Sequence, residues 1–114
     1  MAGIQEIHTI EEWNARKKES SGEIIIFKFS PICAISESVE KDFDSWILQQ
    51  PNDRITCYKV NVIDSKPLSR KLADEVGVFH QSPQVIWLTD KRKVKWHASH
   101  YDITPRNLSE NINS

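Results

Sequence analysis

The two cysteines are the residues of this chain best suited to covalent chemistry. Cys33 follows one apolar segment and precedes Ser36 by three positions, whereas Cys57 lies within a second apolar segment. Two cysteines are too few for the disulfide framework of a small secreted scaffold. Each is therefore expected to be a free thiol, either buried as a small apolar side chain or exposed and reactive.

Cys33 is expected at the start of a helix. The segment Glu23–Phe29 is nearly all apolar, as in a strand covered on both faces, and apolar side chains then recur at helical spacing over residues 33–50. Open α/β sheets present their functional residues at such a strand end. The unpaired N–H groups and the dipole of the first helical turn favour an anion, so we expect this position to stabilise the Cys33 thiolate. A stabilised thiolate is a good leaving group, which suits a carrier that accepts a thiol adduct and then releases it.

Ser36 shares a helix face with Cys33 because it lies three positions later. A serine cannot close an internal disulfide, although its hydroxyl can hydrogen-bond a thiolate. The spacing predicts monothiol chemistry in which an external thiol completes each cycle. The alternative is that Cys33 is an inert structural cysteine in a binding or adaptor domain.

Cys57 is interpreted as structural because its neighbours are apolar and aromatic. The other possibility is that it resolves Cys33 within the molecule. That reaction needs Cα atoms within about 7 Å, which a position in the middle of a strand is not expected to meet.

Capping and turn signals indicate the remaining elements. Thr9 and Glu12 form a capping box at the start of a helix over residues 9–18, and a later helix is capped by Asp64 or Ser65 and ends at Gly77. Residues 51–53 are expected to end the helix that follows Cys33. The other expected elements are strands at 54–62, 84–89 and Val94–Ser99, a polar turn at 90–93, and a short last helix that begins at Thr104 and Pro105.

The resulting order is α-β-α-β-α-β-β-α. It predicts one domain over residues 1–114, an α/β/α sandwich of three layers with a central mixed sheet. The helices fall on both faces because parallel strands need right-handed crossovers.

Composition excludes several classes of function. The chain carries 15 Lys and Arg against 16 Asp and Glu, so it lacks the cationic surface of a nucleic-acid binder or a polybasic membrane anchor. Its longest apolar run, residues 24–27, is far shorter than a membrane span, and the N-terminal residues lack the pattern of a secretory signal. We expect a cytoplasmic protein that binds neither nucleic acid nor membrane and is a monomer or a weak dimer.

Other conspicuous residues have plainer interpretations. His97 and His100 would point to opposite faces of a strand, so no metal site is expected. His80 lies two residues before Ser82 and could approach the thiol, but a polar loop residue without a role is the simpler interpretation. The cationic cluster at 91–93 is expected to be a solvated hairpin tip. Trp13, Trp46 and Trp87 fall on apolar stripes and are expected in the core, and Trp96 is expected to flank an edge.

Four motifs together resemble the monothiol bacilliredoxin family. They are SPICAIS at residues 30–36, KPLS at 66–69, HQSPQ at 80–84 and KWHASH at 95–100, and the resemblance covers nearly the whole chain. Members of this family have the thioredoxin fold and are linked to bacillithiol, a low-molecular-weight thiol of some Gram-positive bacteria.

The resemblance implies a function and a set of site residues. Cys33 would attack the mixed disulfide between a protein and bacillithiol, and a second bacillithiol would regenerate it. Ser36 matches the resolving position of dithiol relatives, and Pro31 and Ile32 flank the nucleophile on the substrate side. Ser82-Pro83 matches the cis-proline site, where the backbone pairs with an extended substrate. No bound cofactor is implied; bacillithiol is the co-substrate, and bacillithiolated proteins are the partners.

The sequence departs from the family pattern at three positions. Ala34 stands where Pro usually follows the active cysteine, and Phe29 stands where a polar residue is expected. Phe27 stands where thioredoxins carry a buried acid that helps to handle protons. Ala34 and Ile35 also differ from the Gly and Phe of cluster-binding monothiol glutaredoxins, so iron–sulfur delivery is not expected.

Overall fold

The computed structural model describes residues 3–50 and 55–112. Its strands are β1 (Gly3–Glu6), β2 (Glu23–Phe29), β3 (Ile55–Asn61), β4 (Gln84–Leu88) and β5 (Val94–Ser99). Its helices are α1 (Ile10–Glu19), α2 (Ala34–Leu48), α3 (Lys66–Val76), the short 3-10 helix η1 (His100–Asp102) and α4 (Pro105–Glu110). Among the described residues, no helix is both long and apolar enough to cross a membrane.

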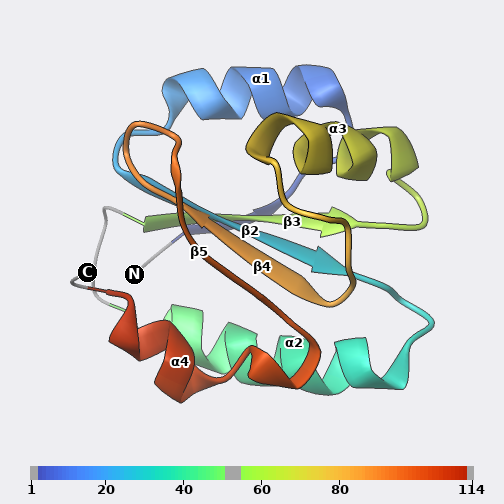
Figure 1. Ribbon diagram of the computed structural model, residues 1–114, viewed down its shortest axis with the longest axis vertical. Helices are drawn as coiled ribbons and strands as arrows, with labels where there is room; N and C mark the ends of the chain where they lie inside the picture. The colour runs from blue at the N-terminus through green and yellow to red at the C-terminus, as the bar shows by residue number, and fades with distance from the viewer. Residues whose placement is uncertain (1–2, 51–54, 113–114) are drawn as a thin grey trace.

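The elements form three layers, as the sequence predicts. The strands make one sheet in the order β1-β3-β2-β4-β5, in which β1, β3 and β2 are parallel and β4 is antiparallel to both β2 and β5. Helices α1 and α3 cover one face of this sheet, and α2 and α4 cover the other (Figure 1).

β1 is an element that the sequence analysis did not predict. All four of its residues are exposed, and it pairs in parallel with β3 at the edge of the sheet. An exposed edge strand has no buried face, so it lacks the apolar alternation that identifies strands in a sequence. The prediction that residues 51–53 end the preceding helix falls outside the described residues, as does Arg54 at the start of the predicted third strand.

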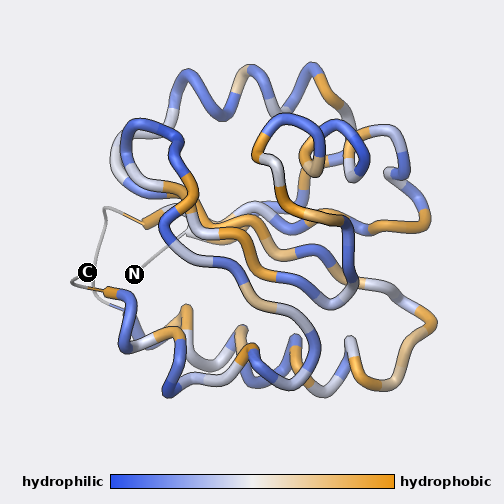
Figure 2. The backbone as a smooth tube through the Cα atoms, in the orientation of Figure 1, coloured by the Kyte–Doolittle hydropathy of each residue, from blue (hydrophilic) through white to orange (hydrophobic). Residues whose placement is uncertain are grey.

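The core has two halves, one on each face of the sheet. The half under α2 and α4 contains Trp46 and Trp87, and the half under α1 and α3 contains Trp13. All three indoles are buried, as predicted, while Trp96 is only partly buried against the α2 side. Figure 2 shows the matching concentration of apolar residues along the central strands.

Two of the three predicted N-terminal caps accept side-chain hydrogen bonds, whereas Ser65, the N-cap residue of α3, makes no such bond. The Thr9 hydroxyl accepts a hydrogen bond from the Glu12 N–H at 3.0 Å, and Thr104 accepts one from the Asn107 N–H at 3.1 Å. Gly77 ends α3 with a φ of 71°, a left-handed conformation that glycine adopts at little cost. Local sequence therefore determines where these helices begin and end.

The interpretation of the cluster at 91–93 as a purely solvated tip is wrong for Arg92. Its guanidinium is partly buried and donates to the backbone carbonyls of Lys17, Ser20 and Gly22, at the end of α1 and the loop that follows. Arg92 also has a φ of 64°. The side chain therefore fastens the β4–β5 hairpin to the α1–β2 loop.

Sheet register brings two connecting loops to the same end of the sheet, the end at which β2 and β3 terminate. The antiparallel pairing of β2 with β4 runs from Ile24 opposite Leu88 to Lys28 opposite Gln84. The chain therefore leaves β2 toward Cys33 at the same end at which it enters β4 after Pro83. This edge, where the parallel strands β2 and β3 also end, is the place where such sheets carry their functional groups.

Candidate active site

Cys33 is the N-cap residue of α2. Its backbone is extended, with φ −108° and ψ 122°, and its carbonyl accepts the first helical hydrogen bond from the Glu37 N–H at 3.1 Å. The Cys33 residue is partly exposed and its thiol is free. The sequence therefore predicted the start of this helix to within one residue. A free thiol at this position can accept hydrogen bonds from the unpaired N–H groups of the first helical turn.

Ser36 is buried and holds the loop that precedes the helix. Its Oγ accepts a hydrogen bond from the Ser30 N–H at 2.9 Å, and the Cys33 N–H donates to the Ser30 carbonyl at 3.4 Å. No hydrogen bond joins Ser36 to the Cys33 thiol among the described residues. The hydroxyl proton of Ser36 is still available to a thiolate, but the observed role of Ser36 is to fix the turn in front of Cys33.

Pro31 and Ile32 form the surface next to Cys33. Both are exposed, and the Ile32 residue is 84% exposed to solvent. A large apolar side chain at this exposure gains free energy when a partner covers it.

The Ser82–Pro83 peptide bond is cis, in agreement with the position that the resemblance implies. Pro83 is buried, and its carbonyl accepts a hydrogen bond from the His100 N–H at 3.0 Å. The Ser82 Oγ atom is buried and has no hydrogen-bond partner among the described residues. A buried hydroxyl without a partner is unusual in a folded protein, and it marks this loop as a place where a bound group could complete the bonding.

Phe27 is buried at the position where thioredoxins carry an acid. Its ring stacks on Phe43 with the centroids 4.5 Å apart. The charged groups near Phe27 are instead Lys59 of β3 and two carboxylates of α2. The Lys59 ammonium is 2.8 Å from Glu40 Oε2 and 2.6 Å from Asp44 Oδ1. Burial alone would lower the pKa of Lys59, but its hydrogen bonds to Asp44 and Glu40 raise that pKa above its ordinary value.

Cys57 lies in the core on the α2 side of the sheet with no exposed surface. Burial raises the pKa of its thiol, which suppresses the reactive thiolate. Its environment fits the structural interpretation.

A polar cluster behind the Pro83 loop was missed by the sequence analysis. Lys28 lies within the apolar run of β2 and has no exposed surface, and its ammonium lies 3.0 Å from the Ser69 carbonyl and 3.4 Å from His80 Nδ1. The Ser69 hydroxyl is 3.1 Å from the same His80 nitrogen. Burial lowers the pKa of Lys28 to about 8. Partial burial and the charges of Lys28 and Arg70 lower the pKa of His80.

Comparison with known proteins agrees with this geometry. The family model of the monothiol bacilliredoxin BrxC matches residues 5–108. Among solved structures, one described as a candidate oxidoreductase with a thioredoxin fold is similar with a TM-score of 0.84 and 21% identity, over 95% of this chain and 92% of that one.

Two thioredoxins are also similar in fold. The reduced thioredoxin pre-protein of Schistosoma mansoni has a TM-score of 0.72 and 13% identity, over 98% of this chain and 97% of that one. The thioredoxin of Malassezia sympodialis has a TM-score of 0.72 and 18% identity, over 99% and 90%. The TM-scores of these structures establish the thioredoxin fold, and the match over residues 5–108 establishes the family. The chain belongs to the monothiol bacilliredoxin BrxC family.

Proposed function

We propose that this protein is a monothiol thiol–disulfide oxidoreductase that removes bacillithiol from mixed disulfides on proteins. The observation that carries the proposal is the position of Cys33, a partly exposed free thiol at the N-cap of α2 in a bacilliredoxin-family chain. Family membership suggests thiol oxidoreductase activity, and the resemblance to bacilliredoxins supplies the substrate. Cys57 is excluded as the reactive group because it is fully buried.

The reaction has two exchange steps. The Cys33 thiolate attacks the bacillithiol sulfur of the mixed disulfide, forms a Cys33–bacillithiol disulfide and releases the protein thiolate, which takes up a proton. The thiolate of a second bacillithiol attacks the adduct and releases the Cys33 thiolate together with oxidised bacillithiol. In the net reaction, one mixed disulfide and one bacillithiol become one protein thiol and one oxidised bacillithiol, so the second bacillithiol is the reductant and its sulfur takes the place of the protein sulfur in the disulfide.

The neighbouring residues have supporting roles in this proposal. The unpaired N–H groups of the first turn of α2 can donate hydrogen bonds to the Cys33 sulfur when it leaves in the second step. Ser36 keeps the loop from Ser30 to Cys33 in place through its buried hydrogen bond. Ile32 offers an apolar contact to the substrate, and the backbone of Ser82 offers a polar one.

A reductase assay on a bacillithiolated model protein tests the proposal. In the presence of excess bacillithiol, the native protein should release bacillithiol from the substrate, Cys33→Ser should not, and Cys57→Ser should retain most of the activity. Equal rates for the native protein and Cys33→Ser would contradict the proposed function.

The same variants separate the enzyme from an adaptor domain. An enzyme captures its partners as mixed disulfides, so reductant releases them and Cys33→Ser does not bind them. An adaptor with an inert cysteine would bind the same partners in both forms, with or without reductant.

A further inference from the structure

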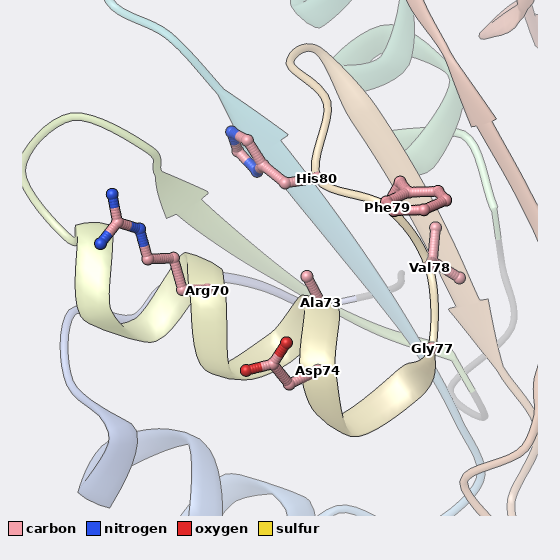
Figure 3. Close-up of a pocket in the computed structure, with 7 residues that line it drawn as sticks. All are labelled: Arg70, Ala73, Asp74, Gly77, Val78, Phe79 and His80. Carbon is pink, nitrogen blue, oxygen red and sulfur yellow. The ribbon is translucent and has the colours of Figure 1, made fainter.

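A cleft on the α3 side of the sheet carries two exposed side chains, Arg70 and His80, with donors that find no acceptor among the described residues. Arg70, Ala73 and Asp74 of α3 line it on one side and residues 77–80 line it on the other, and its volume is about 540 Å³. The guanidinium of Arg70 has no hydrogen bond or ion pair within the described part of the chain. In Figure 3 the His80 ring lies beside the tip of β2, and the Arg70 side chain extends outward from α3 toward the same side of the view.

The hydrogen bonds of His80 determine which of its nitrogens carries the proton. The Lys28 ammonium has only donors to offer, and it lies 3.4 Å from Nδ1. A pKa of about 8 leaves Lys28 mostly protonated at pH 7, so Nδ1 must act as the acceptor. The proton of the neutral imidazole is therefore on Nε2, the nitrogen that is not engaged by Lys28 and Ser69.

Buried side chains hold this arrangement in place. Lys28 and Gln84 are opposite one another in the sheet, and both are buried. Gln84 Nε2 donates to the Phe79 carbonyl at 2.8 Å, and Gln84 Oε1 accepts from the Gln81 N–H at 3.4 Å. Together with the contact between Lys28 and His80, these bonds fix three successive residues of the loop. The Nε2–H group of His80 is thus presented from a rigid support.

We propose that Arg70 and His80 bind a carboxylate of the small thiol or disulfide that reacts at Cys33. The Nε2–H of His80 and the N–H groups of Arg70 supply charge-assisted donors, and the buried Lys28 ammonium adds positive potential behind them. This inference rests on the proposed function, because it assigns a binding site to the co-substrate of that reaction.

The position of the cleft fits such a co-substrate. Lys28 lies on β2, five residues before Cys33, and His80 lies two residues before Ser82. The loop after β2 and the loop before β4 therefore lie at the same end of the sheet as Cys33. The Phe79 residue is 92% exposed and forms an apolar wall of the cleft. Neither Cys33 nor Ser82 lines the cleft itself, so a ligand held there by its carboxylate has to extend past the loop that contains Ser82 to bring its sulfur to Cys33.

Asp74 restricts where the anion can bind. It is one helical turn from Arg70, and no ion pair joins the two within the described residues. In Figure 3 the Asp74 carboxylate lies away from His80, lower in the view. A second anion is repelled from that end, so the carboxylate of the ligand is directed to the end with Arg70 and His80.

A comparison of two disulfide probes tests this subsite. The first, 5,5′-dithiobis(2-nitrobenzoate), carries carboxylates, and the second, 2,2′-dithiodipyridine, is neutral; both report thiol attack by absorbance. Rate constants at Cys33 are measured for the native protein, for Arg70→Gln, and for Lys71→Gln, which removes the same charge from the next residue of α3, exposed like Arg70 but outside the cleft. Arg70→Gln should lower the ratio of the carboxylate rate to the neutral rate by about fivefold or more, and Lys71→Gln by less than about twofold.

Each other outcome overturns the proposal. Equal losses for Arg70→Gln and Lys71→Gln would indicate long-range attraction instead of a site, and equal rates for all three proteins would show that Arg70 binds no carboxylate. A loss for both probes would indicate an effect on Cys33 itself. If Arg70→Gln slows only a protein mixed disulfide, the carboxylate belongs to the protein substrate.

A binding measurement separates failure of the subsite from failure of the proposed function. Succinate is titrated into Cys33→Ser while NMR follows the His80 imidazole, with NaCl at equal ionic strength as the control. Succinate should shift the His80 signals and raise the pKa of His80 in Cys33→Ser, and the shift should be lost in the double variant with Arg70→Gln. Absence of the shift contradicts the subsite even if Cys33 proves reactive, and its presence supports the subsite even if Cys33 proves inert.

Discussion

At the scale of single residues, environment separates the two thiols. Cys33 is partly exposed at a helix N-terminus, whereas Cys57 is fully buried in the core and the pKa of its thiol is raised. The same side chain is a candidate nucleophile in one place and a small apolar residue in the other. Both interpretations were accessible from the sequence because each depends on the immediate neighbours.

Lys28 gives the stability of the protein a defined pH dependence. Folding lowers the pKa of Lys28 from 10.5 to about 8, so between these values the unfolded chain binds more protons than the folded one. The free energy of unfolding of the native protein should therefore rise with pH in this window, by up to about 1.4 kcal/mol per pH unit from this group. Lys28→Met lacks the titrating group, so its free energy of unfolding should not show this rise. The free energy of unfolding of Lys28→Met minus that of the native protein should therefore decrease between about pH 8 and about pH 10.

Urea unfolding followed by tryptophan fluorescence measures this difference. The exposed Lys41 on α2 supplies the control, since Lys41→Met should follow the native protein at every pH. Parallel curves for Lys28→Met and the native protein would show that burial does not lower the Lys28 pKa.

Ser36 should contribute to stability through its bond to the Ser30 N–H. Ser36→Ala leaves that donor without its partner, which should cost about 1–3 kcal/mol of unfolding free energy. Ser38→Ala, at an exposed position of the same helix, should cost less than about 0.5 kcal/mol. Chemical denaturation of the two variants makes the comparison, and equal losses would remove the structural role assigned to Ser36.

The residues that the sequence analysis missed interact over long distances in the chain. Lys28 is 52 positions from His80, and no local pattern marks a lysine in an apolar strand as the partner of a loop histidine. The partner of Ser36 is close in sequence, but it is the Ser30 N–H and not the Cys33 thiol that helix spacing suggested.

At the scale of elements, prediction succeeded where a signal is local and failed where an element depends on a partner. Thr9 and Gly77 cap their helices through their own chemistry, and both were predicted. β1 forms because the backbone of β3 offers hydrogen-bond partners along its free side. The four exposed residues of β1 show no alternation of apolar and polar side chains that would identify a strand.

Arg92 at the hairpin tip also depends on partners that are distant in the sequence. Its charge alone predicts an exposed side chain, but its guanidinium donates hydrogen bonds to three backbone carbonyls at the end of α1 and in the loop before β2. Arg92→Gln should lower the unfolding free energy by about 1–2 kcal/mol because it cannot reproduce these bonds. Lys91→Gln, at the exposed neighbour, should leave thermal and urea transitions nearly unchanged. A similar effect of both variants would restore the interpretation of a solvated tip.

At the scale of the whole molecule, element order was sufficient to predict the sandwich. Buried strands joined by amphipathic helices have few ways to cover both faces of a sheet. Register then brings the loop before Cys33 and the loop that contains Ser82 to one edge. The proposed function depends on that end of the sheet, where the partly exposed Cys33 lies near a loop whose buried polar supports come from the neighbouring strands.

Incubation with oxidised bacillithiol, followed by intact mass and peptide mapping, shows whether Cys33 accepts bacillithiol. We expect one bacillithiol adduct per chain, located on the peptide that contains Cys33, removable by fresh bacillithiol and absent from Cys33→Ser. An unmodified protein, or an adduct on Cys57 of the folded chain, would contradict the account.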